Sequence, residues 1–269
     1  MLVNGLPSAS ISPQDRGFNY GDGVFRTLLV RQGRPHSWNR HYLKLQQDCA
    51  ALRLDCPSSE TLLSDISTLS ATAPNGVVKI VVTRGDGQRG YAISGSPTPV
   101  RVVTLNPIPV FEDHHYTSGI RLHRCRLKLG HQTRLAGIKH LNRLENVLAA
   151  TECTELGLPE GLLEDADGYL VSGTRSNLFF IRGRTLYTPD LSRCGVAGVQ
   201  RERVMDWAKE NGVECKVAQM HFEEMLRAEE IFMVNSVFGL WPVGQVASYK
   251  RSEHPTSWKI QEWLNDENN

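Results

Sequence analysis

The stretch LAGIKHLNRLENVLA, residues 135–149, sets a single lysine among apolar neighbours. Lys139 follows Ile138 and precedes His140 and Leu141. Most lysines lie on the protein surface, so position alone assigns no role to this one. An apolar setting nevertheless lowers the pKa of a lysine amine, because burial penalises the charged form. Only the neutral amine attacks a carbonyl or takes up a proton, which makes Lys139 a candidate catalytic residue.

The sequence around this lysine is strongly basic. Between His114 and Leu144 there is no Asp or Glu, and the window holds five of the nine histidines. Such a run is either a solvated strand face or a pocket for a small polyanion. Its cationic residues are Arg121, Arg124, Arg126, Lys128, Arg134, Lys139 and Arg143.

Composition limits the classes of protein to be considered. The 269 residues are 40% hydrophobic, which is enough for one large or two smaller domains with a buried core. The 30 Lys and Arg oppose 29 Asp and Glu, and a net charge of +1 argues against nucleic acid or an anionic membrane as a partner. We therefore expect any anion to be recognised locally.

The cysteines and the N-terminal sequence indicate a cytoplasmic protein. No C-x-x-C pair or regular spacing occurs, so we expect reduced thiols and neither a disulfide framework nor a metal site. The N-terminus lacks the basic start and apolar run of a secretory signal, and no segment approaches the length of a membrane span. The six cysteines are Cys49, Cys56, Cys125, Cys153, Cys194 and Cys215.

Hydrophobic periodicity predicts an α+β fold, because helices and strands are mixed without a strict βαβ rhythm. Pro107, Pro109 and the polar stretch 112–118 interrupt both periodicities. We therefore expect an N-terminal domain over 1–107, a linker over 108–119 and a C-terminal domain over 120–269. The expected helices cover about 37–52, 60–70, 141–156 and 199–211, and the expected strands 25–30, 77–83, 100–105, 120–127 and 231–234.

Five stretches of the chain carry a combined signal: DRGFNYGDGVFRT (15–27), GIKHLNRLE (137–145), SGTRSNLFF (172–180), YTPDLSRCGVAGVQR (187–201) and IFMVNSVFGLWPV (231–243). In their order along the chain they resemble one enzyme family, the fold-type IV enzymes that use pyridoxal 5′-phosphate (PLP). This family includes branched-chain and D-amino-acid aminotransferases and aminodeoxychorismate lyase. The resemblance implies two α/β domains with PLP in the cleft between them, a homodimer, and covalent attachment of the cofactor to Lys139.

Two motifs favour the lyase within this family. The aminotransferases have a tyrosine five residues after the lysine, where this chain has Leu144. The loop RGDGQRGY, residues 84–91, is similar to the lyase and implies that Arg84, Arg89 and Tyr91 bind a dicarboxylate, since guanidinium pairs with carboxylate in a fork. The implied reaction splits 4-amino-4-deoxychorismate into 4-aminobenzoate and pyruvate.

The resemblance also implies a set of cofactor-binding residues. The turn 195–198 leads into a helix whose backbone amides at Val199 and Gln200 are suited to a phosphate, as helix N-termini generally are. Asn235 and Ser236 are assigned to the same phosphate.

At two further positions this chain departs from the commoner family pattern. Lys44 stands where most members have an arginine on the phosphate, and Ser172 stands where many have a glutamate against the pyridine nitrogen. We expect both residues to contact the cofactor.

Two alternatives remain. One is a branched-chain or D-amino-acid aminotransferase of the same fold, because fold alone does not fix function. The absence of the tyrosine at 144 and of the glutamate at 172 argues against it. The other is a non-catalytic module that binds anions or nucleic acid through residues 121–143. The near-zero net charge and the absence of interleaved aromatic residues argue against that second alternative.

Overall fold

The computed structural model describes residues 1–7, 10–93, 95 and 97–266. The chain forms two compact units. Unit 1 contains residues 1–109 together with Ile138–Asn142, and unit 2 contains residues 110–137 and those from 143 onward. The division after Pro109 lies inside the expected linker, whereas the return of Ile138–Asn142 to unit 1 differs from the expected boundaries.

Unit 1 is built on a six-stranded sheet in the order β2-β1-β6-β5-β3-β4, and its neighbouring strands are antiparallel. Its elements are β1 (Leu2–Val3), β2 (Leu6–Pro7), α1 (Arg16–Tyr20), β3 (Gly23–Arg31), β4 (Arg34–Pro35), α2 (Trp38–Ala51), α3 (Ser59–Ser70), β5 (Gly76–Thr83) and β6 (Val100–Asn106).

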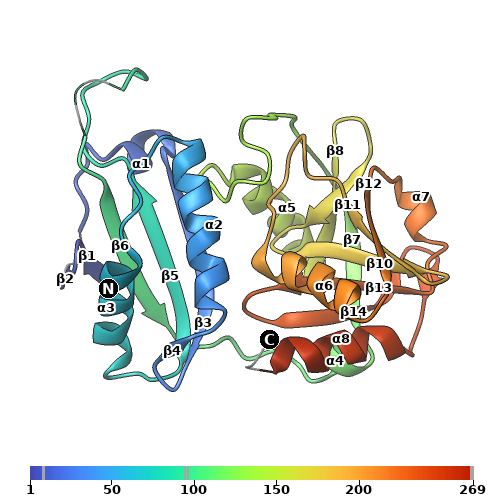
Figure 1. Cartoon of the computed structure of the whole chain (residues 1–269). Helices are drawn as coiled ribbons and strands as arrows, with labels where there is room; N and C mark the ends of the chain where they lie inside the picture. Colours follow the sequence, from blue (N-terminus) through green and yellow to red (C-terminus); the bar gives the residue numbers. More distant parts are fainter. Residues whose placement is uncertain (8–9, 94, 96, 267–269) are drawn as a thin grey trace. The chain divides into compact units, whose positions relative to one another are not determined.

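The core of unit 1 lies between this sheet and two helices, α2 and α3 (Figure 1). Side chains alternate between the two faces of a strand, so Val78, Ile80 and Val82 of β5 all point into this core. From the helices, Leu45 and Leu62 meet them. Fully burying each such side chain contributes about 1.5–3 kcal/mol, which makes this sheet a firm support for residues placed on it.

The segment Ile138–Asn142 joins unit 1 because it pairs with β3. His140 forms an isolated antiparallel bridge with Val24, and Ile138 is buried in the same core as α2. This pairing also explains why the helix expected to begin at residue 141 begins at Leu144.

Unit 2 is built on a nine-stranded mixed sheet in the order β12-β11-β10-β13-β14-β7-β8-β9, with β15 paired to β14. Its elements are α4 (His114–Thr117), β7 (Ile120–Leu129), α5 (Leu144–Glu155), β8 (Glu160–Asp165), β9 (Leu170–Gly173), β10 (Asn177–Arg182), β11 (Thr185–Pro189), α6 (Val199–Glu210), β12 (Glu214–Ala218), α7 (Phe222–Met225), β13 (Glu230–Asn235), β14 (Gly239–Val246), β15 (Tyr249–Lys250) and α8 (Pro255–Asn265).

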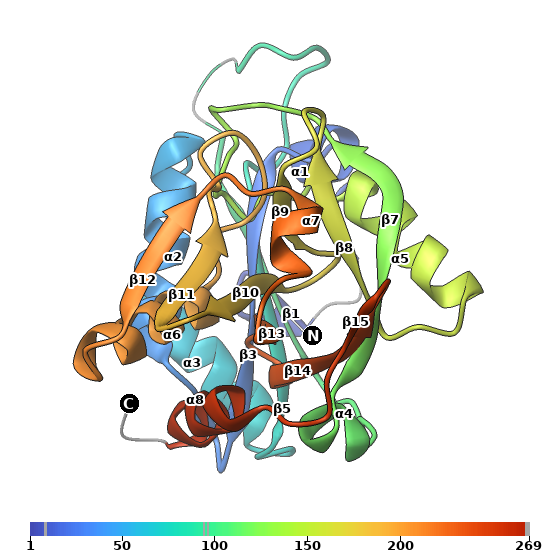
Figure 2. The same ribbon diagram turned by 90° about the vertical axis from the view of Figure 1, so that its right-hand side faces the viewer.

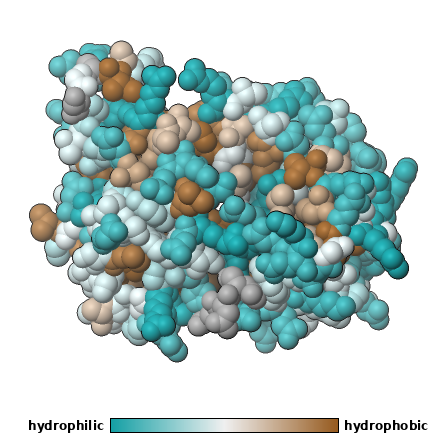
Figure 3. Space-filling view, in the orientation of Figure 1, coloured by the Kyte–Doolittle hydropathy of each residue, from teal (hydrophilic) through white to brown (hydrophobic). Residues whose placement is uncertain are grey.

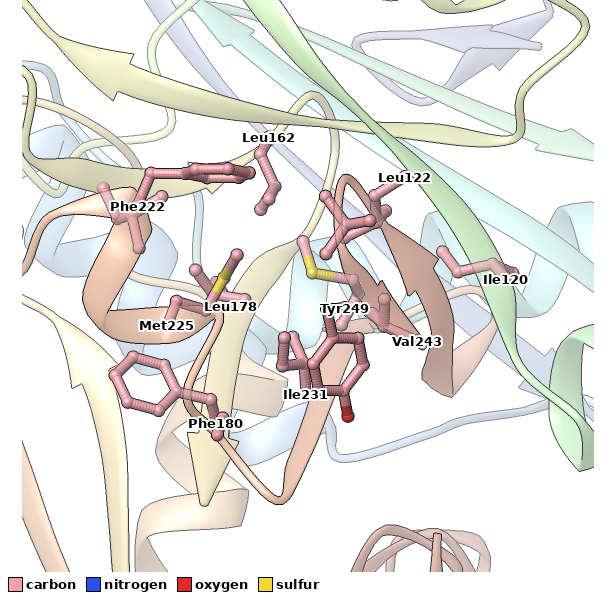
Figure 4. Close-up of a cluster of buried hydrophobic side chains, with 14 of the residues drawn as sticks. Ile120, Leu122, Leu162, Leu178, Phe180, Phe222, Met225, Ile231, Val243 and Tyr249 are labelled. Atoms are coloured by element: carbon pink, nitrogen blue, oxygen red, sulfur yellow. The ribbon is translucent and has the colours of Figure 1, made fainter. Parts of the chain in front are cut away.

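Three hydrophobic clusters fill unit 2. The largest lies inside the curved sheet and includes Leu162, Leu178 and Ile231 (Figure 4). A second packs α6 and α8 against β10, β11, β13 and β14, with Trp207 and Phe232 buried in it. The third lies between α5 and strands β7 to β9, and Figure 2 shows α5 alongside β7.

Hydrophilic side chains predominate on the face drawn in Figure 3, with hydrophobic ones interspersed among them. Across the described ranges, none of the helices combines the length and the apolar character that crossing a membrane requires.

Candidate active site

The backbone of Lys139 is held on two sides within unit 1. Its carbonyl accepts a hydrogen bond of 2.9 Å from the N–H of Phe25 on β3. Its own N–H donates to Oδ2 of Asp48 on α2, at 3.0 Å. The Nζ atom lies 4.5 Å from the centroid of the Phe25 ring. Both backbone polar groups of the lysine are thus bonded, and its side chain extends from a fixed point, which suits a catalytic group.

A buried ion pair supports Asp48. Arg26 of β3 donates through Nη2 to Oδ2 of Asp48, and these residues are 2% and 4% exposed. The same nitrogen donates to the backbone carbonyl of Lys44 at 3.2 Å. Motif reasoning overlooked Asp48, although its spacing to His41 and Leu45 puts an acidic residue on the buried face of α2, a pattern that signals a special role.

Lys44 lies one turn before Asp48 on α2 and is half-buried. Burial raises the pKa of Asp48, while Arg26, the N–H of Lys139 and the ammonium of Lys44 each act in the opposite direction. Lys44, Asp48 and Lys139 therefore belong to one electrostatic group in unit 1.

The expectation that Arg84 binds a substrate carboxylate needs correction, because its guanidinium is hydrogen-bonded within the fold. Its Nε and Nη2 donate to the two oxygens of Asp22 at 2.8 and 3.0 Å. Nη1 and Nη2 donate to the backbone carbonyls of Arg53 and Leu52 at 2.8 and 2.7 Å. Burial alone would raise the pKa of Asp22, but the hydrogen bonds from Arg84 and Arg16 hold it below its ordinary value. Arg84 thus serves the fold and is not free to grip a substrate carboxylate.

The other two expected substrate residues lie on the same loop and remain exposed. Arg16 donates to the carbonyls of Gly90 and Tyr91, both at 2.9 Å, and so ties the loop to α1. The Tyr91 ring packs edge-on against Tyr20 with 5.4 Å between centroids and is 85% exposed. Arg89 is also exposed. Their positions leave both side chains able to meet a ligand from solution.

In unit 2, the first turn of α6 presents backbone N–H groups without a side-chain cap. Its N-cap is Gly198, where an added Cβ would lie 2.3 Å from Oδ1 of Asn177. That oxygen accepts the N–H of Gly198 at 3.2 Å, and Nδ2 of Asn177 donates to the carbonyl of Val196 at 2.8 Å. Asn177 therefore fixes the turn that precedes the backbone N–H groups of Val199 and Gln200. Sequence reasoning missed this role of Asn177.

Asn235 and Ser236 stand at the end of β13, the neighbour of β10. Asn177 pairs with Val234 of β13 and also hydrogen-bonds the turn before α6. This one residue therefore links the end of β13 to that turn. Oδ1 of Asn235 accepts the N–H groups of Val237 and Phe238, both at 2.9 Å. The side chain of Asn235 thus shapes the turn, and Ser236, which is half-buried, offers the hydroxyl.

Ser172 is buried on β9, where its hydroxyl donates to the carbonyl of Gly173 at 2.8 Å. The turn that follows is organised by Glu160, whose carboxylate accepts the N–H of Thr174 and the hydroxyl of Ser176, both at 2.8 Å. Ser172 therefore lies on the strand that leads into this turn, and its side chain carries no charge.

Three of the seven cationic residues in the basic stretch are paired with carboxylates within unit 2. Arg124 donates to both oxygens of Glu164 at 2.9 and 2.8 Å, and Lys128 donates to the same carboxylate at 2.5 Å. Arg126 lies 3.7 Å from Glu152. These pairs favour the simple interpretation of a charged strand face and weaken the hypothesis of a non-catalytic anion-binding module.

Comparison with known proteins decides the family. The family described as amino-transferase class IV matches residues 23–246. The chain belongs to this family. Among solved structures, that of 4-amino-4-deoxychorismate lyase from Pseudomonas aeruginosa is 40% identical, with a TM-score of 0.94 and 98% of each chain covered. The expected α+β fold of the fold-type IV enzymes is therefore confirmed.

Two curated relatives have different names. Aminodeoxychorismate lyase of Vibrio harveyi is 32% identical over 246 residues, which cover 91% of each chain. D-alanine aminotransferase of Bacillus licheniformis is 25% identical and covers 88% of this chain and 83% of its own length. Similarity is thus higher to these lyases than to this aminotransferase.

Proposed function

We propose that this class IV chain is an aminodeoxychorismate lyase, a PLP-dependent enzyme that converts 4-amino-4-deoxychorismate into 4-aminobenzoate and pyruvate. One observation carries the proposal: Lys139 is bonded through both its N–H and its carbonyl, to Asp48 and Phe25. The likeness to the lyases of P. aeruginosa and V. harveyi supports it. We place the enzyme in the cytoplasm, where its six free cysteines stay reduced.

Taken unit by unit, the predicted cofactor residues have the chemistry that a phosphorylated aldehyde requires. In unit 2, the capless first turn of α6 and the hydroxyl of Ser236 suit a phosphate, because helix N-terminal N–H groups and the helix dipole favour an anion. In unit 1, Lys44 carries a positive charge, and Lys139 supplies the amine that would hold the aldehyde carbon. When bound, PLP supplies a conjugated ring that withdraws electrons from the substrate carbon bearing the amine.

Lys139 then acts as a base on the substrate. Nζ of Lys139 would remove the proton from C4, the substrate carbon that bears the amine. The bond between C3 and the enolpyruvyl oxygen breaks, and the ring becomes aromatic. Enolpyruvate takes up one proton to become pyruvate, which balances the proton removed from C4. Asp48 and Phe25 hold the backbone from which the Lys139 side chain extends.

Arg89 and Tyr91 are proposed to recognise the carboxylates of the substrate. Both are exposed on a loop that Arg16 fastens to α1. Guanidinium forms bidentate pairs with carboxylate, and a phenol can donate one further hydrogen bond. Arg84 is left out of this role because its guanidinium is already paired with Asp22.

Lys44→Ala is expected to weaken PLP binding without changing the products. A charge-assisted contact contributes about 1.5–3 kcal/mol, or about one to two decades in affinity. Titration of the cofactor-free protein with PLP measures the dissociation constant. Lys44→Arg should restore binding, because arginine also binds phosphate. An unchanged constant in Lys44→Ala would remove Lys44 from the site.

We propose that the enzyme is a homodimer that uses an exposed face of α5. Leu144, Val147 and Leu148 follow helical spacing and are 69%, 57% and 51% exposed. An apolar stripe of this kind is typical of an interface. Val147→Lys is expected to shift the protein to monomer in light scattering, whereas Val217→Lys, which changes an exposed valine on β12, should leave the dimer intact. A dimer that persists in Val147→Lys at micromolar concentration contradicts this use of α5.

The direct test of the function is an assay for both products. Purified protein is loaded with PLP and supplied with enzymatically generated 4-amino-4-deoxychorismate, and 4-aminobenzoate and pyruvate are measured together. We expect the two in equal amounts. A parallel reaction with D-alanine and 2-oxoglutarate distinguishes the aminotransferase alternative. Amino-group transfer without 4-aminobenzoate formation would replace the lyase proposal with that alternative.

A further inference from the structure

Three potential metal ligands of unit 2, none of which has been assigned to catalysis, lie together between β7 and α5. His123 and Cys125 are two residues apart on β7, so their side chains leave the same face of the strand. Glu152 comes from α5, which packs against that face. The imidazole nitrogen, the thiol sulfur and a carboxylate oxygen all lie within 4.8 Å of one another.

An irregularity in β7 fixes the carboxylate of Glu152. The register between β7 and β8 shifts between Arg124 and Lys128, which takes two N–H groups out of the ladder. Those of Arg126 and Leu127 donate instead to Oε2 and Oε1 of Glu152, at 2.8 and 3.1 Å. Such bonds orient a metal-binding carboxylate in the way that outer hydrogen bonds do in established metal sites.

The carboxylate already faces the imidazole. Nε2 of His123 lies 3.1 Å from Oε2 of Glu152. Ligand atoms around a tetrahedral Zn²⁺ stand about 3.3–3.8 Å apart, given bond lengths of about 2.0–2.3 Å. An ion can therefore replace the hydrogen bond between these two side chains with little movement, while Cys125 needs a small shift toward it.

A second thiol lies beside the first. An added Cβ at Gly161 of β8 would lie 2.5 Å from Sγ of Cys153 and 2.6 Å from Sγ of Cys125, so both sulfurs occupy the space that the missing side chain leaves. The Cys125 thiol donates to the carbonyl of Ala149 at 3.9 Å. Zinc binds the thiolate, so a bound ion takes the place of this thiol proton.

We propose that His123, Cys125 and Glu152 bind one Zn²⁺, with water as the fourth ligand. Nitrogen, sulfur and oxygen donors are the set that this borderline-soft ion takes, and three protein ligands leave one position for solvent. Binding releases the thiol proton of Cys125, and the neutral imidazole coordinates through Nε2. The site is reachable because the side chains of His123 and Glu152 are 23% and 15% exposed.

The spacing of the cysteines led us to expect no metal site. That expectation considered neighbouring positions in sequence, whereas these ligands come from a strand and from a helix more than twenty residues later. Pairing of β7 with β8 and packing of α5 bring them together.

Titration of the intact, chelator-treated protein with Co²⁺ tests the proposal. We expect one ion per chain, with a thiolate-to-cobalt charge-transfer band and the intense visible bands of a four-coordinate site. Zn²⁺ should remove these bands. His123→Ala and Cys125→Ser should each lose them, while the circular dichroism of each variant without metal reports that it has folded.

The matched control is Cys56→Ser. Cys49 and Cys56 are another pair of neighbouring thiols, in unit 1, so the control separates a built site from general affinity for paired thiols. Retention of the bands in Cys56→Ser supports the proposal. Bands that survive in Cys125→Ser, or that disappear in Cys56→Ser, overturn it, as does failure of the wild-type protein to give a thiolate band. As an independent readout, Zn²⁺ should raise the Tm of the wild-type protein and leave that of His123→Ala, which lacks one proposed ligand, unchanged.

Discussion

Lys139→Ala is expected to abolish turnover while leaving the fold intact. The change removes the amine that holds the cofactor and the base that takes the proton from C4. Loss of a general base alone lowers a rate by about 10²–10⁴-fold, and loss of the covalent attachment adds to this. The side chain is half-buried and its two backbone bonds do not depend on it, so Tm should change little.

The attachment site can be checked directly on the wild-type protein. Borohydride reduction of the PLP-loaded enzyme, followed by proteolysis and mass spectrometry, should find the cofactor on the peptide that contains Lys139. Lys79→Ala is the matched control, because Nζ of Lys79 lies 5.1 Å from the centroid of the same Phe25 ring that Lys139 approaches. Label on Lys79, or full activity in Lys139→Ala, would refute the assignment.

Periodicity and motifs predicted the parts of this protein that depend on local signals. The helix expected over 199–211 is α6, Val199–Glu210, since its apolar spacing and the glycine that follows it are both local. The helix expected from residue 141 begins three residues later, because Ile138–Asn142 is held by β3, far away in sequence. The β3 pairing could not be inferred from the segment itself.

The same distinction applies to the site. The motif identified Lys139, but nothing near it in sequence points to Asp48, which is 91 residues away and accepts its N–H. Arg84 has the right residue type for gripping a carboxylate, yet the partner that it binds is Asp22 of its own unit. Residue type therefore predicted the chemistry, whereas folding decided which charged groups remained free to perform it.

The chain offers two buried aspartates that permit a controlled test of how Lys139 is held. Asp48 on α2 pairs with Arg26, and Asp65 on α3 pairs with Arg101 at 2.7 Å. Both carboxylates have 6% exposed side chains and both partners come from the sheet of unit 1. Only Asp48 also bonds to Lys139. A loss of kcat specific to folded, PLP-loaded Asp48→Asn therefore reports on the position of the lysine.

Asp48→Asn is expected to lose about 3–5 kcal/mol of unfolding free energy, because it leaves the buried charge of Arg26 uncompensated. Asp65→Asn should lose less, since the side chain of Arg101 is 22% exposed and water can solvate it. Among molecules that remain folded and loaded with PLP, kcat should fall on the order of 100-fold in Asp48→Asn, the cost of a small misplacement of a catalytic group, and stay near wild type in Asp65→Asn. Denaturant unfolding and single-turnover kinetics at a temperature where both variants are folded measure the two effects separately. Equal rates in the two variants would mean that the bond to Asp48 stabilises the fold without positioning Lys139, whereas a rate loss confined to Asp48→Asn ties the position of the amine to the buried pair of α2 and β3.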